Sequence, residues 1–284
     1  MPARFRPLVT CAAFTVFAAT SIAHAQTIAL STASPTGLSG VNFENDSLIQ
    51  YDPLTDVAAQ LFDLEDEFGI SRNLIAAHEM PNGNLIVSTQ AGDTIGGVAF
   101  TESDLIELDR TTGTASLFFD ASAVGLTGQG GSVPNIDAVS VLPNGLVFFS
   151  TRNDATLFGV DYGKEDLISY DPVAGTASLA FDGSLINGTE PNLRAAAILN
   201  DETLLFAASE GGSSDTMTIG GVTFNRDDLV IYNTLSGTVT LFMEGGDEFT
   251  GSQIVDAVTV VGIPEPATLG LAAIPLLALG RRRR

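Results

Sequence analysis

The stretch Ile254-Val255-Asp256-Ala257-Val258-Thr259-Val260-Val261 has the composition of a β-strand, but no partner strand follows it. Its Val255–Val258 segment matches Ile136–Val139, which begins a run of four predicted strands earlier in the chain. Because no such run comes after Val261, this last strand must find its partners elsewhere. The choice of partner decides the fold.

Four copies of one unit make up the chain between its two ends. Each copy contains a strand-like apolar segment, and the four segments start 57, 62 and 62 residues apart. They are Leu48–Asp52, Leu105–Asp109, Leu167–Asp171 and Leu229–Asn233. A Gly-Val-x-aromatic tetrapeptide precedes each segment, and a turn with a second apolar run follows it. A repeat period near 60 residues indicates an array or a propeller.

Each unit has the pattern of strands throughout. In the third unit we expect strands at residues 136–142, 146–151, 166–171 and 176–181, separated by turn sequences such as Pro143-Asn144-Gly145. No segment of the repeats shows the period of a sustained amphipathic helix. Four antiparallel strands are what one propeller blade requires.

The two ends of the repeat region complement each other. The first unit begins at its second strand, residues 27–32, and lacks a first strand, whereas the strand at residues 254–261 is a first strand without followers. Joined, the ends complete one blade and leave no free sheet edge between them. We therefore predict an all-β fold for residues 26–262: a four-bladed β-propeller closed by pairing residues 254–261 with the N-terminal strands.

Three charged residues are predicted to meet near the axis of this ring. The first strand of every unit carries an alanine at one position, where converging blades leave little room: Ala76, Ala138, Ala195 and Ala257. Before these alanines stand Ile75, Asp137, Arg194 and Asp256, and the two aspartates belong to opposite blades. One interpretation is a buried ion network in which Arg194 neutralises both carboxylates. The other is a ligand or metal site beside the channel.

The N-terminal 25 residues have the features of a secretory signal peptide. Arg4 and Arg6 form a basic region, residues 8–19 are apolar, and Ala23-His24-Ala25 is a small-x-small cleavage site. We predict a signal helix that is removed after Ala25, so the protein would be exported.

The C-terminal segment has the polarity of a membrane stop signal. Pro264-Glu265-Pro266 is followed by fourteen uncharged residues, 267–280, and by a basic stop of Arg281, Arg282, Arg283 and Arg284. As a helix the apolar run would be about 21 Å long at 1.5 Å per residue, shorter than roughly 30 Å of hydrocarbon. We expect an apolar helix that is a poor permanent span.

Residues 263–284 resemble the PEP-CTERM sorting signal of Gram-negative bacteria, in which a Pro-Glu-Pro motif precedes an apolar segment and a basic tail. The resemblance implies recognition of Pro264, Glu265 and Pro266 by a membrane protease of the exosortase type. It also implies transient anchoring in the membrane, removal of the tail, and transfer to the cell surface or to extracellular polysaccharide. The alternative is an ordinary tail anchor that is never processed.

Charge excludes one class of partner. Between the two terminal signals the body keeps 33 of the 34 acidic residues and only six of the twelve basic ones, for a net charge near −27. Such a body is repelled by nucleic acid and by anionic membrane surfaces. The acidity serves solubility, or some carboxylates hold calcium. The acidic loops at residues 63–67 and 244–248 lack the EF-hand pattern, so we predict no cofactor and leave weak calcium binding open.

The chain has few of the residues from which catalytic or zinc sites are usually built. Cys11 lies in the signal peptide, and His78 is the only histidine between the two terminal signals, which excludes the usual zinc sites and cysteine catalysis. Two functions remain: a non-enzymatic surface or matrix module that binds polysaccharide or surface proteins, and a secreted carbohydrate-active hydrolase or lyase. The enzyme would use Asp137 and Asp256 as an acid/base pair, which requires an open pocket.

Overall fold

The computed structural model describes residues 27–210 and 216–261. The predicted signal helix and the predicted C-terminal apolar helix lie outside the described residues. The described chain is mostly β, built from several small antiparallel sheets, as the repeats predict. No described helix is both long and apolar enough to span a bilayer.

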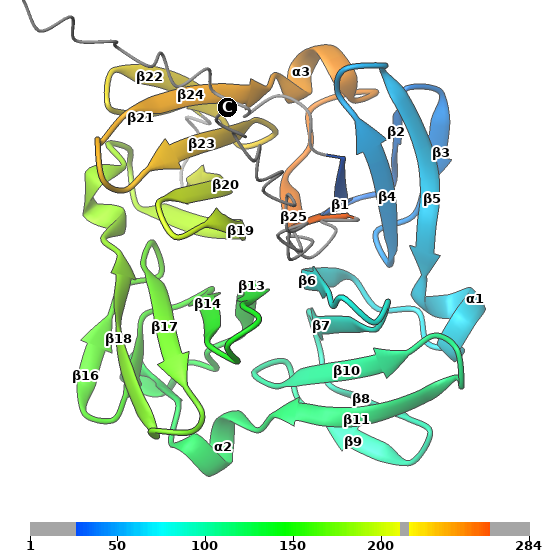
Figure 1. Ribbon diagram of the computed structural model, residues 1–284, viewed down its shortest axis with the longest axis vertical. Coiled ribbons are helices and arrows are strands. Elements are labelled where there is room, and N and C mark those ends of the chain that lie inside the picture. The colour runs from blue at the N-terminus through cyan, green and yellow to red at the C-terminus, as the bar shows by residue number, and fades with distance from the viewer. Residues whose placement is uncertain (1–26, 211–215, 262–284) are drawn as a thin grey trace, which may run out of the picture.

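Four of the sheets have four strands each (Figure 1). Sheet 1 contains β25 (Val255–Val260), β1 (Ile28–Thr32), β4 (Ser47–Asp52) and β5 (Val57–Asp63). Sheet 2 contains β6 (Leu74–Glu79), β7 (Leu85–Thr89), β10 (Leu105–Asp109) and β11 (Thr114–Phe119). Sheet 3 contains β13 (Ile136–Val141), β14 (Val147–Thr151), β17 (Leu167–Asp171) and β18 (Thr176–Phe181). Sheet 4 contains β19 (Pro191–Asn200), β20 (Thr203–Glu210), β23 (Leu229–Asn233) and β24 (Val239–Met243).

The last described strand lies in the same sheet as the first. Strand β25 pairs with β1 in antiparallel register, from Ile28 opposite Val260 to Thr32 opposite Val255. The pairing continues beyond both strands, where the Val261 N–H donates to the Thr27 carbonyl at 3.0 Å. The strand that the sequence left without neighbours therefore has the partner that the phase of the repeats predicts.

The four sheets are joined to one another by equivalent hydrogen bonds. In each case the backbone N–H at the start of an innermost strand donates to a carbonyl in the loop before the third strand of the preceding sheet. The pairs are Leu74 with Asn45 (2.9 Å), Ile136 with Glu102 (3.2 Å), Leu193 with Lys164 (3.1 Å) and Val255 with Arg226 (3.3 Å). The last pair links sheet 4 to sheet 1, so the four sheets follow one another in cyclic order (Figure 1).

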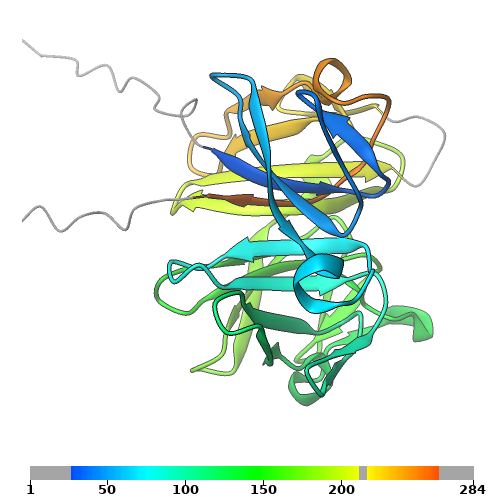
Figure 2. The same cartoon turned by 90° about the vertical axis from the view of Figure 1, so that its right-hand side faces the viewer.

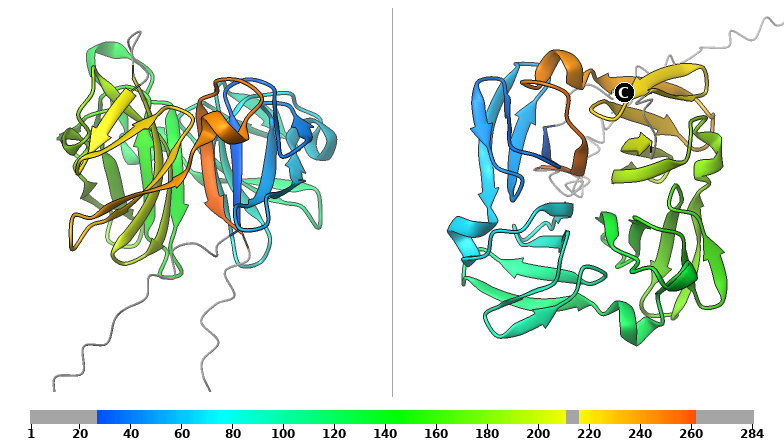
Figure 3. Two further views of the ribbon diagram at one scale, coloured as in Figure 1. Left: turned by 90° about the horizontal axis from the view of Figure 1, so that it is seen from above. Right: turned by 180° about the vertical axis from the view of Figure 1, so that it is seen from behind.

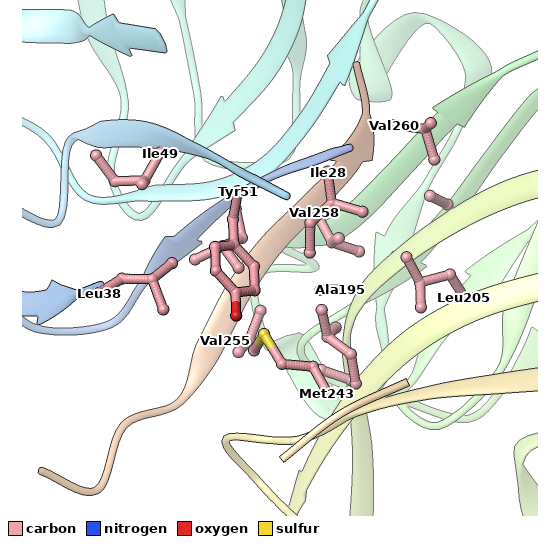
Figure 4. Packing of buried hydrophobic residues seen from close by; sticks show 14 of the residues in the cluster. Ile28, Leu38, Ile49, Tyr51, Ala195, Leu205, Met243, Val255, Val258 and Val260 are labelled. Carbon is pink, nitrogen blue, oxygen red and sulfur yellow. The ribbon is translucent and has the colours of Figure 1, made fainter. Parts of the chain in front are cut away.

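An apolar cluster fills each junction between adjacent sheets. The cluster between sheets 4 and 1 includes Ile28, Tyr51, Ala195, Leu205 and Val258 (Figure 4). Separate clusters join sheets 1 and 2, sheets 2 and 3, and sheets 3 and 4. The interface between sheets 4 and 1, to which both β1 and β25 contribute, is thus packed by the same kind of residues as the other three.

Small hairpins join the second and third strands of each sheet, and the sequence did not predict them as strands. They are β2 (Thr36–Leu38) with β3 (Val41–Phe43), β8 (Asp93–Ile95) with β9 (Val98–Phe100), β15 (Ala155–Leu157) with β16 (Val160–Tyr162), and β21 (Thr216–Ile219) with β22 (Val222–Asn225). The two-residue strand β12 (Thr127–Gly128) adds to β15. The Gly-Val-x-aromatic tetrapeptide supplies the turn, with its glycine at positive φ, and the buried aromatic ring of the hairpin.

Short helical turns follow the outermost strands. They are α1 (Leu64–Phe68), α2 (Ala121–Val124), the 3₁₀ turn at Gly183–Leu185 and α3 (Gly245–Glu248), and a further 3₁₀ turn spans Gln129–Gly131. The two acidic stretches at 63–67 and 244–248, expected as loops, contribute α1 and α3 instead. In α1 the Asp63 carboxylate accepts from the Asp66 N–H and Gly69 ends the turn in the left-handed conformation, so local capping converts the loop into a helix.

Candidate functional site

Each of the four innermost strands contains a β-bulge near the centre of the molecule. The register skips Ile75, Asp137, Arg194 and Asp256, the four residues that directly precede the repeated alanines. A bulge leaves one residue unpaired on its strand and re-aims its side chain. The alanines themselves, Ala76, Ala138, Ala195 and Ala257, are all buried, as their position in the repeat predicts.

Arg194 joins the two aspartates that stand at the equivalent position on either side of it. Its Nη1 donates to Asp137 Oδ2 at 3.0 Å, and its Nη2 donates to Asp256 Oδ1 at 2.6 Å. One guanidinium from sheet 4 therefore connects sheet 3 with sheet 1. The structure brings together the three residues that the alignment of the repeats selected.

Two asparagines, which sequence reasoning missed, extend this cluster. The Asn192 amide donates to Asp137 Oδ2 at 3.3 Å, and the Asn73 amide donates to Asp256 Oδ2 at 3.1 Å. Both asparagines precede the bulged residue by two positions, and Asn135 occupies the same place in the third unit. That coincidence in the repeat was the signal that could have found them.

The cluster is sealed from solvent. The side chains of Asp137 and Asp256 are each 1% exposed and that of Arg194 is 7% exposed. Burial raises the pKa of Asp137 to about 6, despite the opposing effect of Arg194, and the nearby charge of Asp256 adds to the increase. The two carboxylates raise the pKa of Arg194 against the effect of its burial. Two carboxylates facing one guanidinium leave an excess negative charge in the cluster, which adds to the effect of burial on the pKa of Asp137.

A cavity of about 290 Å³ opens beside Arg194, between sheets 3 and 4. Arg152, Asn153 and Lys164 line it from sheet 3 and its loops, whereas Glu190, Asn192 and Glu210 belong to the sheet 4 side. Asn192 Oδ1, Glu210 Oε2 and Arg194 Nε are buried and have no hydrogen-bond partner among the described residues. The residues that line the cavity combine cationic side chains with carboxylates and amides, which suits a polar guest. Among the described residues, no cluster of three His, Cys, Asp or Glu side chains could hold a metal ion.

His78 lies in β6 as a partly buried strand residue. Burial lowers its pKa to about 4, although a hydrogen bond with the Val141 backbone acts in the opposite direction. Two of its three counterparts in the repeat make similar contacts between neighbouring innermost strands. Ser140 Oγ accepts from the Ile198 N–H, and Thr259 Oγ1 accepts from the Glu79 N–H, both at 3.1 Å. His78 thus belongs to the packing between sheets 2 and 3.

The predicted signal-cleavage residues Ala23 and Ala25, the sorting motif Pro264–Pro266 and the basic stop Arg281–Arg284 lie outside the described residues. These assignments stay predictions.

Comparisons with known proteins do not identify a family. No family model and no curated protein matches the chain. A protein of unknown function from Bacteroides caccae aligns with 83% of this chain and 98% of its own length, at 9% identity and a TM-score of 0.42. Another of unknown function, from Bacteroides thetaiotaomicron, aligns over 75% of this chain and 46% of its own, at 10% identity and a TM-score of 0.36. YCF48 bound to a D1 peptide aligns over 70% and 48%, at 7% identity and a TM-score of 0.30. This chain spans less than half the length of the latter two proteins.

Proposed function

We propose that the four sheets are the blades of a four-bladed β-propeller that closes where β25 joins β1. Three features of the described chain support closure: the four equivalent hydrogen bonds between sheets, the four apolar clusters, and the pairing of the first and last strands. A closed ring has no free sheet edge between its ends, which removes a site for aggregation.

The propeller is a non-catalytic binding or structural module of the cell surface or extracellular matrix. One observation carries this choice over a hydrolase or lyase: Asp137 and Asp256 are both 1% exposed and both bonded to Arg194. A glycosidase acid/base pair must contact substrate and, in the hydrolytic step, water. Carboxylates held this way act as a structural joint between blades.

Export and sorting complete the proposal. Residues 1–25 direct secretion, and an exosortase-type protease recognises Pro264, Glu265 and Pro266 while residues 267–280 hold the chain in the membrane. Removal of the tail after the Pro-Glu-Pro motif releases a body that retains every strand, because β25 ends at Val260. The freed module joins the cell surface or its exopolysaccharide matrix.

Mass spectrometry of the native protein tests the sorting step. We expect the intact mass to lack residues 1–25 and the apolar tail in the host, and to retain the tail when the exosortase gene is deleted. A C-terminus that runs to Arg284 in both strains would contradict exosortase processing and favour a permanent tail anchor.

The cavity beside Arg194 is the candidate site for a hydroxyl-rich ligand such as a segment of extracellular polysaccharide. Sugar hydroxyls would donate to the Glu190 carboxylate, accept from Arg152 and pack against Asn192, all of which line the cavity.

Calorimetric titration with the polysaccharide of the producing organism tests this assignment. We expect Arg152→Ala and Asn192→Ala to weaken binding at least about tenfold, the effect of about 1.4 kcal/mol. Arg72→Ala is the matched control, because Arg72 is exposed and pairs with Asp93 away from the cavity. Equal binding by all variants would contradict the site. Release of reducing ends that Asp137→Asn abolishes would favour the hydrolase instead.

A further inference from the structure

The most exposed large apolar side chains of the described protein stand at one repeated position. Val173 is 92% exposed, Leu235 76% and Leu54 63%. Each is the second residue after the Asp or Asn that ends the third strand of sheets 3, 4 and 1, at the tip of the turn to the outermost strand. Sheet 2 carries the polar Thr111 there. Scattered exposed aliphatics need no explanation, but three at equivalent tips form a pattern.

These tips are fixed in place by their turns. The backbone N–H of Leu54 donates to Asp52 Oδ1 at 2.9 Å, that of Val173 to Asp171 Oδ1 at 2.8 Å, and that of Leu235 to Asn233 Oδ1 at 3.1 Å. Side-chain to backbone bonds of this kind stabilise a tight turn. The aliphatic side chains are therefore held outward by local structure and are not drawn into the neighbouring core.

All three tips lie on the face from which both ends of the propeller leave. The register places Tyr51 opposite Ile28 and Ile28 opposite Val260, so the turn after β4 adjoins the start of β1 and the end of β25. Figures 2 and 3 show these two strand ends at the same edge of the molecule. We name this edge the terminal face: the turns at 53–56, 110–113, 172–175 and 234–238, together with Thr27 and Val261.

Neighbouring innermost strands run in the same direction, which places the other turns on the terminal face too. The Glu79 N–H at the end of β6 bonds to Thr259 near the end of β25, and the Ile198 N–H in β19 bonds to Ser140 in β13. In sheet 3, Tyr170 pairs with Val147, which pairs with Val141 at the end of β13. In sheet 4, Asn233 pairs with Thr203, which pairs with Asn200. The cavity beside Arg194 lies at the opposite ends of the strands.

We propose that the terminal face rests on the surface of a lipid bilayer and inserts Leu54, Val173 and Leu235 into its interfacial layer while the C-terminal segment anchors the chain. This inference rests on the anchoring step of the proposed function. Val261 stands six residues before the apolar run that begins at Ala267, so the intervening chain reaches at most about 20 Å. With so short a connection, the face that carries Val261 must lie close to the membrane, and the opposite face with the cavity points outward.

The negative charge next to these turns determines which lipids the terminal face can contact. Asp52, Asp109 and Asp171 end the strands that lead into these turns, and Arg110 of the terminal face is paired with Glu67. The contact is therefore apolar and not electrostatic, and anionic lipid weakens it. The tether keeps the tips at high effective concentration, and the body leaves the membrane once the tail is cut.

Fluorescence from single cysteine labels tests this contact in the full chain. In a Cys11→Ser background, an environment-sensitive fluorophore is placed at Leu54→Cys, Val173→Cys or Leu235→Cys, and the chain is reconstituted in phosphatidylcholine vesicles. Matched controls are Val133→Cys and Leu185→Cys, which replace aliphatic residues, each 47% exposed, remote from the terminal-face turns. Vesicle flotation measures anchoring in the same samples.

We expect blue-shifted emission and quenching by lipid-borne quenchers at the three tips but not at the two control positions, and smaller effects as phosphatidylglycerol is added. A label at Thr111→Cys, in the equivalent turn of sheet 2, should also show blue-shifted emission. This blue shift should disappear when Leu54, Val173 and Leu235 are replaced by serine. Chains that float with all five labels exposed to water would overturn the membrane contact and leave anchoring intact. Chains that do not float would overturn anchoring and the contact together. Quenching that requires a second protein copy, seen as dilution dependence, would assign the face to self-association instead.

Discussion

Arg194 is the residue on which the central ion network depends. Its guanidinium is the counter-charge that both Asp137 and Asp256 contact, and all three side chains are buried. Removing one member of a buried ion network leaves unpaired charge in a medium of low dielectric, whereas replacing the whole network by uncharged groups is often tolerated. The cost of changing Arg194 should therefore depend on which residues accompany it.

We predict that Arg194→Met lowers the free energy of unfolding by about 3–5 kcal/mol. The triple variant Asp137→Asn, Arg194→Met, Asp256→Asn should lose less than this single change, because no charge is left buried. Urea unfolding measures both. Arg72→Met, at an exposed pair, is the control and should cost about 0–1 kcal/mol. A triple variant that loses as much stability as Arg194→Met, or more, would show that the three residues do not act as one network.

Asp137 and His78 should give opposite pH dependences of stability. The pKa of Asp137 is raised from 3.8 to about 6, so its contribution is fully present below pH 4 and is lost as pH rises through 6. The pKa of His78 is lowered from 6.5 to about 4, so its contribution is present above pH 6.5 and is lost as pH falls through 4. In the native protein the two effects oppose each other between pH 4 and 6.

Substitution of Asp137 should leave only the pH dependence of stability that His78 causes, and substitution of His78 should leave only that of Asp137. Relative to the native protein, the stability of Asp137→Asn should rise with pH between 4 and 6.5, and that of His78→Gln should fall, by up to about 3 kcal/mol for the buried aspartate and less for the partly buried histidine. Thermal or urea unfolding at several pH values measures both slopes. Slopes equal to that of the native protein would refute these pKa assignments.

Single residues were foreseen to different degrees. Position in the repeat selected Asp137, Arg194 and Asp256, because equivalent residues of a ring converge on its axis. The β-bulges that aim these side chains could not be foreseen, since strand periodicity alone assigns each residue to one of two faces. Asn73 and Asn192 were missed because amides carry no charge pattern.

Among the elements, the helical turn α3 packs so closely on the backbone of Asp227 that its first residue must be a glycine. A Cβ built on Gly245 would meet the backbone carbonyl oxygen of Asp227, whereas one on Gly246 would meet nothing within 4 Å. The Gly245 N–H also donates to the buried Asp228 Oδ1 at 2.9 Å, which ties α3 to the start of β23. The two adjacent glycines therefore form a matched pair.

We predict that Gly245→Ala destabilises the protein by about 1–3 kcal/mol, because the backbone must shift to admit the methyl group. Gly246→Ala should be neutral or stabilise by up to about 1 kcal/mol, because alanine favours the helical conformation. Midpoints of thermal unfolding for the two variants decide the matter. Equal midpoints would contradict the close packing of α3 on β23.

The elements were predictable where apolar residues recur at strand spacing, as in β13, β14, β17 and β18. The small hairpins escaped because their strands have three or four residues, too few to establish a period of two. The helical turns α1 and α3 escaped because capping by side chains and glycines, and not amphipathic periodicity, determines them.

At the scale of the whole molecule, the phase of the repeats is what predicts the ring. In an open array, a first unit without its first strand and a last strand without followers would both lack partners. In a closed array the two ends complete one sheet, and β25 pairs with β1 as that argument requires. The cavity beside Arg194 and the apolar tips of the terminal face could not be derived in this way. They depend on residues that differ between the units, such as Arg152 and Val173, and only the folded structure shows what lies next to these residues.

Closure of the ring within one chain is the central claim, and a disulfide across β1 and β25 tests it. Ile28 and Val260 are direct partners in the register, and the chain has no cysteine other than Cys11. In a Cys11→Ser background, Ile28→Cys with Val260→Cys should form an intramolecular disulfide. A loop of this length should stabilise the protein by on the order of 5 kcal/mol in the chain-entropy model, less the loss of two apolar side chains.

The offset pair Ile28→Cys with Ala257→Cys is the control, because Ala257 is opposite Ser31 and lies about three residues, roughly 10 Å, along the strand from the partner of Ile28. The measurement is the mobility of the oxidised, unfolded chain on a non-reducing gel together with its mass. We predict a compact, cross-linked monomer for the 28–260 pair and free thiols for the 28–257 pair. A cross-linked dimer, or free thiols in the 28–260 variant, would contradict a propeller closed by its own two ends.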